Sequence, residues 1–380
     1  MKVGVAVSML NVGEKADSEI YRDDLKLADL AEPLGFDSIW SVEHHFTGYA
    51  MVPNVVQLLT YFAGRTTRVQ LGTAVIVLPW HDPVRVAEEM SMLDNLSGGR
   101  TIFGFGRGAA TVEYDGFRIP MDESRARFEE VAKIVIQALT NERFSYDGQF
   151  YKIPETSIRP RPLSHPERRL YASSVSPESA EIMAKLGIGV LIVPQKDWDT
   201  AVADVERYRA TARAVGFTPK PPIGLINVSI RESGDEAVED AHIYMGAMFD
   251  SIDAHYHFSD GHLQGVKGYE FYAKMAKTYS KFSDLTVKTK AVDYFVSLHV
   301  SGTPQQCLDK IVEIRNRTGM DHFVGQFSYG GMPAEKCEKN MRLFAEKVKP
   351  VLQDEASFPL FPKKDQSGRA ETWRRWPICP

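Results

Sequence analysis

The chain has 380 residues, of which 43% are hydrophobic and 25% charged, and its formal net charge at pH 7 is −5. These values are ordinary for a globular protein, and no long basic run favours nucleic-acid binding. Because no segment reaches membrane-spanning length and the N-terminus is too short for a signal-peptide core, we expect a cytoplasmic protein that binds neither membranes nor nucleic acids.

The first half of the chain alternates short hydrophobic strands with amphipathic helices. Hydrophobic periodicity predicts strands at residues 2–8, 37–42, 68–78 and 100–106, and helices at about 18–34, 53–64, from 83 and from 124. The helix from 124 has a single apolar face formed by Phe128, Val131, Ala132, Val135 and Leu139. A hairpin insertion is predicted at 143–153, with Asp147-Gly148 as its turn.

The second half repeats the alternation and adds one unusual segment. Strands are predicted at 169–173, 189–193, 223–230 and 321–327, and helices ending near 215, starting near 234, and at 303–318 and 333–352. Residues 255–300 have no clean period and are too long for a passive connection, so an irregular insertion is expected there. The tail at 353–380 is rich in proline and charge.

Eight strand–helix units predict an α/β protein with a parallel sheet, and eight units close naturally into a (β/α)8 barrel over residues 1–352. A doubly wound open sheet is the competing architecture, but no dinucleotide fingerprint follows the first strand. The segment Gly104–Ala109 matches G-x-G-x-x-A only weakly, because it follows the fourth strand and a polar loop is expected after it.

The three cysteines, Cys307, Cys337 and Cys379, form neither a CxxC pair nor a Cys/His cluster. Cys307 and Cys337 lie on apolar faces of predicted helices, which favours buried, inert thiols. So few cysteines, with no disulfide framework, are typical of a reducing compartment.

Functional residues of a barrel gather at the C-terminal ends of its strands. Glu43, His44 and His45 follow the second predicted strand, and imidazole beside carboxylate favours acid/base chemistry near neutral pH. A metal site is the alternative, but adjacent histidines point in different directions from an extended strand and no second ligand pair is suitably spaced. We therefore expect no metal.

Two further loops at the same barrel end favour a phosphate. Arg107 stands between glycines, where a fixed cation lies beside exposed backbone N–H groups, and Arg125 opens the following helix. Ser176, followed by Pro177, is typical of a helix N-cap, and a helix N-terminus at this face binds phosphate well. The alternatives are that Arg125 is a solvated surface residue and that Ser176 only caps its helix.

Several runs together resemble the bacterial luciferase-like, flavin-dependent monooxygenases. The resemblance spans about residues 1–352 and is carried by the segments 36–47, 72–79, 83–85, 93–100, 103–108, 124–126 and 302–307. It implies a barrel that binds FMN noncovalently, with reduced FMN and O2 forming a flavin hydroperoxide that oxygenates a small, apolar organic substrate such as an aldehyde, ketone, terpene or aromatic compound.

The resemblance also implies roles for individual residues. His44, flanked by Glu43 and His45, would be the catalytic histidine, and Glu113 would lie close to the flavin. The flavin phosphate would be held by Arg107, Arg125 and the loop of Ser174, Val175, Ser176 and Ser179. Ala74-Val75 would form a cis peptide bond under the flavin ring, which Gly106 would let approach closely, and a mobile lid would lie within 255–300.

The resemblance also implies a homodimer, in which two copies of the chain contact each other through the helices of the second and third strand–helix units. A separate NAD(P)H-dependent flavin reductase is expected because no nicotinamide-binding domain is visible. Three positions depart from the family: Gly106 replaces a reactive cysteine, Pro194 a tryptophan and Val175 an acidic residue. These departures put light emission and long-chain aldehydes in doubt, and two alternatives stay open: a deazaflavin-dependent oxidoreductase and a non-catalytic flavin-binding protein.

Overall fold

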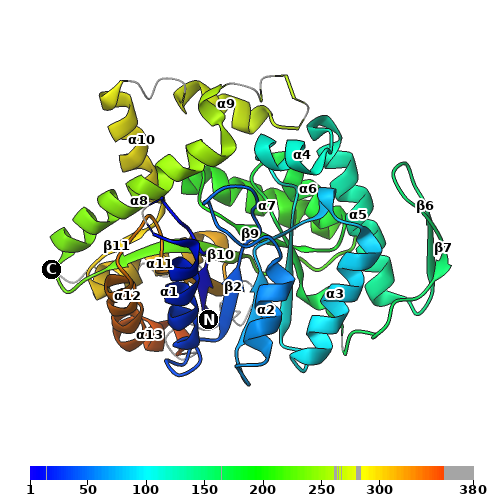
Figure 1. Ribbon diagram of the computed structural model, residues 1–380, viewed down its shortest axis with the longest axis horizontal. Helices are drawn as coiled ribbons and strands as arrows, with labels where there is room; N and C mark the ends of the chain where they lie inside the picture. Colours follow the sequence, from blue (N-terminus) through cyan, green and yellow to red (C-terminus); the bar gives the residue numbers. More distant parts are fainter. Residues whose placement is uncertain are drawn as a thin grey trace, which may run out of the picture.

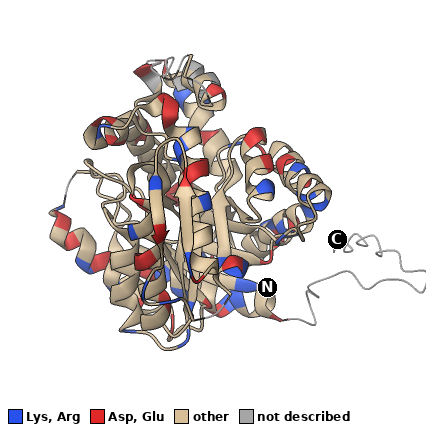
Figure 2. Ribbon diagram, turned by 90° about the vertical axis from the view of Figure 1, so that its right-hand side faces the viewer, with Lys and Arg blue, Asp and Glu red and all other residues tan. Residues whose placement is uncertain are grey.

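The computed structural model describes residues 1–354, except 14, 164, 261, 262, 264, 267 and 280–283. The predicted tail, from residue 355 on and including Cys379, lies outside the described residues. Among the described helices, none combines the length and the apolar character that crossing a bilayer requires. Acidic and basic residues are interspersed over the outer helices (Figure 2).

A closed barrel of eight parallel strands forms the centre of the described chain, as the sequence predicts (Figure 1). Pairing of β10 with both β9 and β12 closes the barrel. Around it the strands are β1 (Lys2–Val7), β2 (Ser38–Ser41), β3 (Gln70–Thr73), β5 (Thr101–Gly106), β8 (Leu170–Ser173), β9 (Gly189–Ile192), β10 (Ile223–Ile230) and β12 (His322–Gln326).

Helices surround the barrel because their apolar faces pack on the outer faces of the strands. On α5 the five apolar residues predicted to share a face are all buried, and so are Cys307 and Cys337. The surrounding helices are α1 (Asp17–Asp29), α2 (Val55–Ala63), α3 (Pro83–Leu96), α5 (Ser124–Thr140), α6 (Pro177–Lys185), α7 (Trp198–Ala214), α8 (Gly234–Tyr256), α11 (Pro304–Thr318), α12 (Ala334–Lys347) and α13 (Lys349–Gln353).

The predicted strand at 68–78 is divided in two. It ends as β3 at Thr73 and resumes as β4 (Ile76–Val77), and the Ala74–Val75 peptide bond between them is cis, as the resemblance implied. A short 3₁₀ turn, Leu78–Trp80, then leads into α3. The apolar run continues through the break, so periodicity alone did not reveal it.

Two local predictions were wrong. The segment Gly104–Ala109 is followed by a helix, α4 (Thr111–Phe117), and not by a polar loop; Glu113 and Tyr114 are buried on it. The hairpin consists of β6 (Phe144–Asp147) and β7 (Lys152–Thr156), and Asp147 pairs with Lys152. Its turn is therefore 148–151 rather than Asp147-Gly148. The carboxylate of Glu130 holds this longer turn by accepting hydrogen bonds from the three successive N–H groups at 149–151.

The segment 255–300 is mostly helical in its described part, which corrects the expectation of an irregular insertion. It contains the end of α8, then α9 (Glu270–Tyr279), α10 (Leu285–Leu298) and the start of β11 (Val300–Gly302), which pairs with β10. Figure 1 shows α4, α9 and α10 at the top, over the barrel end where the strands terminate. These helices cover the face where the functional residues were expected.

Candidate active site

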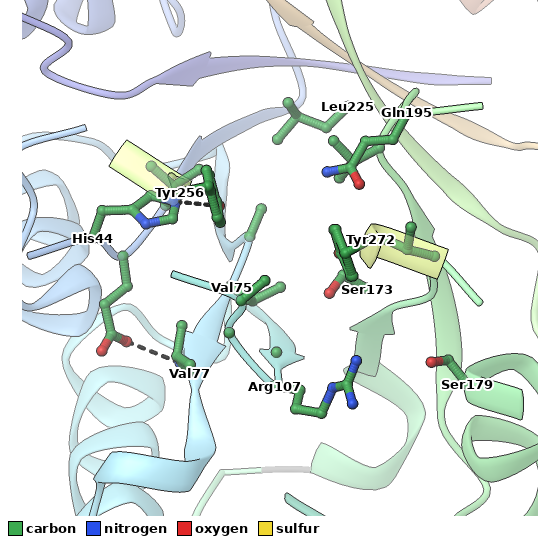
Figure 3. A pocket seen from close by; sticks show the side chains of 18 of the residues that line it. His44, Val75, Val77, Arg107, Ser173, Ser179, Gln195, Leu225, Tyr256 and Tyr272 are labelled. Carbon is green, nitrogen blue, oxygen red and sulfur yellow. Dashed lines mark hydrogen bonds between the residues drawn. The ribbon is translucent and has the colours of Figure 1, made fainter. Parts of the chain in front are cut away.

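A cavity at the C-terminal mouth of the barrel collects most of the predicted site residues (Figure 3). His44 and Arg107 line the same cavity, although they follow different strands. The other predicted residues that line it are Glu43, Ala74, Val75, Gly106, Arg125, Val175, Ser176 and Ser179. Ser173 and Tyr256 also line it, and sequence reasoning missed two further wall residues, Gln195 and Tyr272.

His44 is held by a buried carboxylate. Its Nδ1 lies 3.0 Å from Oε1 of Glu113, which also accepts the backbone N–H of His45 at 2.9 Å. Burial alone would raise the pKa of Glu113, but the charge and hydrogen bonds of His44 and His255 outweigh it and lower that pKa to about 2. Glu113 is therefore a carboxylate that orients the imidazole, and Nε2 of His44 faces the hydroxyl of Tyr256 at 3.5 Å.

His255, at the end of α8, completes this cluster. Its Nε2 lies 3.4 Å from Oε1 of Glu113, and its Nδ1 lies 2.7 Å from the Oγ1 atom of Thr47. Burial and the neighbouring His44 lower the pKa of His255. His44, Glu113 and His255 offer ligand atoms within 4.8 Å of one another, a donor set that a divalent cation accepts. The spacing of 3.0 Å between His44 and Glu113 is also that of an ordinary hydrogen bond.

The buried carboxylate of Glu43 has four partners, one in its own loop and three on the next strand–helix unit. Its carboxylate accepts hydrogen bonds from the N–H of Val77 at 3.0 Å and from Nε1 of Trp80 at 2.9 Å. It also contacts Nε2 of His81 at 2.6 Å and Nε2 of His45 at 3.2 Å. Burial opposes ionisation, but these contacts prevail and lower the pKa of Glu43 to about 2. The carboxylate fixes the chain around β4.

His45 turns away from His44, as expected for adjacent residues. Its ring packs against Trp80 and Phe117, with centroids 6.0 Å and 4.7 Å away. His45 is therefore held in an aromatic cluster beside the cavity, whereas His44 reaches into it.

The floor of the cavity is formed by Val75 and Gly106. A Cβ atom at Gly106 would lie 2.2 Å from Cγ2 of Val75, so only glycine fits beside this valine without a shift. Figure 3 shows Val75 at the centre of the cavity between His44 and Arg107. The surface beneath a bound ring is thus apolar and tightly packed.

The other end of the cavity holds two cations, Arg107 and Arg125. Nη1 of Arg107 and Nε of Arg125 are buried without a hydrogen-bond partner, whereas Nη2 of Arg125 donates to the carbonyl of Gly268 at 3.3 Å. Hydrogen bonds to backbone N–H groups lower the pKa of Glu270, and the charges of the two arginines lower it further. Ser176 caps α6 nearby by accepting the N–H of Ser179. A buried N–H donor is costly unless it is hydrogen-bonded, and a phosphate would satisfy both donors, so these residues fit the phosphate of a nucleotide such as FMN.

Ser174 lies outside this cavity. It lines a small separate cavity with Lys196 and Asp204, whereas Ser173 and Val175 line the mouth. Side chains alternate along an extended strand, and that rule could have separated Ser174 from its neighbours. Pro194 also lines the smaller cavity.

Known proteins resemble this chain over most of its length. The family model of luciferase-like monooxygenases matches residues 1–322. The alkanal monooxygenase alpha chain of Photorhabdus luminescens is 27% identical over 369 residues, covering 95% of this chain and 99% of the relative. The oxygenase component of a flavin-dependent trigonelline monooxygenase from Acinetobacter baylyi is 29% identical over 197 residues, covering 51% of this chain and 54% of the relative.

Solved structures give the same fold. Monooxygenase RslO1 from Streptomyces bottropensis is 30% identical, with a TM-score of 0.73, and the match covers 92% of this chain and 99% of that chain. More distant matches share the fold alone. One is the FMN-bound oxygenating constituent of 3,6-diketocamphane monooxygenase from Pseudomonas putida (17% identity, TM-score 0.67, 92% of this chain and 98% of that one). Another is an F420-dependent secondary alcohol dehydrogenase (16% identity, TM-score 0.68, 93% of this chain and 99% of that one).

Proposed function

The chain belongs to the luciferase-like monooxygenase family, and from this premise we propose that it is an FMN-dependent monooxygenase that uses reduced FMN and O2 to oxygenate a small organic substrate. The observation that carries the proposal is the polarity of one cavity. Two half-buried arginines, each with one buried nitrogen that lacks a hydrogen-bond partner, lie with a helix N-terminus at one end, and a carboxylate-oriented imidazole lies at the other.

In this proposal Arg107, Arg125 and the N-terminus of α6 hold the FMN phosphate, and the ring lies on Val75 and Gly106. Bound reduced FMN supplies two electrons to O2, so that one oxygen atom enters the substrate and the other leaves as water. His44 exchanges a proton at Nε2, since Nδ1 is committed to Glu113.

Exclusion of water is the second requirement of such chemistry. Tyr269, just before α9, is fully buried over the phosphate end and its hydroxyl donates to the carbonyl of Gly108 at 2.9 Å. Arg107 stacks under the Tyr269 ring with its Cζ atom 4.0 Å from the centroid. We propose that this segment is the lid over the bound cofactor.

Two partners belong to the proposal. A separate NAD(P)H-dependent reductase supplies reduced FMN, in keeping with the relative named as an oxygenase component. A second copy of the chain packs on α2 and α3, where the apolar side chains of Tyr61, Met92 and Leu96 are 45%, 54% and 53% exposed. Apolar residues gathered on neighbouring helices favour an interface.

The proposal is tested by cofactor binding and oxygen consumption. The purified chain is titrated with FMN, riboflavin and deazaflavin F420 by fluorescence, and O2 uptake is then followed with photoreduced FMN and candidate aldehydes, ketones and aromatic compounds. Tighter binding of FMN than of riboflavin and substrate-dependent oxygenation are expected. Tight F420 binding without O2 uptake would instead support the deazaflavin enzyme, and FMN binding without turnover of any substrate would support a non-catalytic flavoprotein.

A further inference from the structure

A second cavity, of about 380 Å³, lies beside the mouth cavity among α8, α9 and α10. Its size is within the range of pockets for small-molecule ligands, about 300–1,000 Å³. Its walls are strongly aromatic: rings come from Tyr49, Phe249, Tyr256, Phe258, Tyr272 and Phe295. We call it the aromatic chamber.

The aromatic chamber leads to the catalytic histidine. Tyr49, Gln195, Tyr256 and Tyr272 line both the chamber and the mouth cavity, so the two spaces share a wall. The Tyr256 hydroxyl lies 3.5 Å from Nε2 of His44. A molecule held in the chamber would therefore contact Tyr256 and the other shared wall residues, next to the cavity that His44 lines.

Three rings of this wall form a stack. Tyr256 and Phe258 are nearly parallel, at 9° with centroids 5.0 Å apart, and Phe258 and Tyr272 are at 18° and 5.6 Å. Tyr49 meets Tyr256 edge-on at 71°. Flat faces and ring edges of this kind favour another planar ring, since aromatic pairs prefer offset-stacked or edge-to-face contacts.

The rim of the chamber carries one cation. Lys290 on α10 lines it and is exposed, and among the described residues no carboxylate pairs with it. By contrast Lys288, on the same helix, pairs with Asp250 at 2.7 Å. Tyr294, also on the rim, is 46% exposed, so this side of the chamber reaches the surface.

We propose that the aromatic chamber binds the organic substrate of this enzyme and that the substrate is a planar aromatic molecule bearing an anionic group, which Lys290 recognises at the rim. This inference rests on the proposed function for the chemistry, but the chamber's ligand preference can be measured without turnover. A linear alkyl chain would not use the stacked ring faces or the cation.

The test is calorimetric binding of naphthalene-2-carboxylate, its uncharged amide and decanoate to the FMN-free and the FMN-loaded chain. We expect naphthalene-2-carboxylate to bind at least about tenfold more tightly than decanoate, since only it combines ring stacking with the charge contact. Ala291→Phe fills the chamber and should weaken naphthalene-2-carboxylate about tenfold or more, as should Val287→Trp one turn away. Thr289→Phe, an exposed position of the same helix, is the matched control and should leave binding unchanged.

Lys290→Met should weaken the carboxylate about fivefold but not the amide, whereas Lys288→Met should affect neither. Preference for decanoate, no binding of naphthalene-2-carboxylate, or equal binding to the parent, Ala291→Phe and Val287→Trp proteins would overturn the inference. FMN affinity and O2 uptake are measured on the same samples. Failure of those two with intact naphthalene-2-carboxylate binding would instead count against the proposed function.

Discussion

Nδ1 of His44 lies 3.0 Å from Oε1 of Glu113, although the two residues are 69 positions apart: His44 lies in the loop after β2 and Glu113 on α4, after β5. The Glu113 carboxylate, with its pKa of about 2, is ionised at neutral pH and so accepts a proton-bearing Nδ1. That contact leaves Nε2 directed at the cavity, where it can exchange a proton with a bound molecule. The carboxylate thus determines that Nε2 is the nitrogen of His44 that would react in the proposed function.

His44→Ala should therefore slow substrate oxygenation about 100-fold or more while FMN affinity stays near that of the parent, because an acid/base group is lost without disturbing the phosphate end. Glu113→Gln keeps a hydrogen-bond acceptor but loses the charge, and should cost less, about 10-fold. Steady-state turnover with saturating reduced FMN and fluorescence titration of FMN measure the two quantities. Unchanged turnover in His44→Ala would remove this residue from the mechanism.

Arg107→Ala should weaken FMN binding by about 2 kcal/mol, or roughly 30-fold, which is ordinary for a charge-assisted contact. Riboflavin, which lacks the phosphate, should bind the parent and the variant equally. Arg118→Ala is the control, since Arg118 is exposed and its guanidinium donates to the carbonyl of Gly116, its one hydrogen-bond partner within the described part of the chain. If the parent bound FMN and riboflavin with equal affinity, the phosphate assignment would fail.

Gly106→Ala should weaken FMN binding about tenfold or more. The new methyl group would lie 2.2 Å from Cγ2 of Val75 and would push that stiff side chain into the space above the floor. Adding Val75→Ala to Gly106→Ala should restore much of the affinity, which a nonspecific loss of stability would not allow. Gly64→Ala, whose new methyl group would come no closer than 3.8 Å to the Tyr61 carbonyl, is the control.

The fold followed from the sequence because its signals are local. Strands such as β10 are short segments rich in apolar residues, and helices such as α5 repeat apolar residues at helical spacing, so each element could be assigned from its own residues. The break at Ala74–Val75 was different, since the apolar run crosses it without a turn signal. The cis peptide bond there was expected only because the sequence resembles the family.

The site was predictable only in part because it depends on contacts between distant elements. His44 and Arg107 follow strands and could be placed at the mouth by topology. His255 reaches Glu113 from α8, and Tyr272 reaches the cavity from α9, in a segment whose mixture of aromatic and charged residues hid its helices. The sequence pattern within 255–300 does not indicate which aromatic rings stack on each other. The aromatic chamber could therefore be identified only from the structure.

Leu96→Glu should convert a dimer into a monomer if α2 and α3 form the interface between two copies. A charge placed among Tyr61 and Met92 would have to be buried there without a partner, which costs more than such an interface gains. Size-exclusion chromatography with light scattering gives the mass directly. Val238→Glu, at a 43% exposed position on α8, should leave the mass unchanged; a parent chain that is already monomeric would refute the proposed interface.

Glu43→Gln should lower the free energy of unfolding by about 3 kcal/mol at pH 7. The carboxylate has a pKa of about 2 in the folded chain, below its ordinary value of 4.5, because contacts with His45, His81 and Trp80 outweigh the cost of burial. A carboxylate whose pKa is lower in the folded chain than in the unfolded chain stabilises the fold fully at pH values above the unfolded-state pKa. This stabilisation is lost as the pH falls towards the folded-state pKa. The difference between parent and variant should therefore shrink steadily from pH 5 to pH 3.5 in urea titrations, whereas the exposed Glu239→Gln should show no such difference at any pH. A difference that stayed constant over this range would mean that Glu43 contributes through shape and not through its charge.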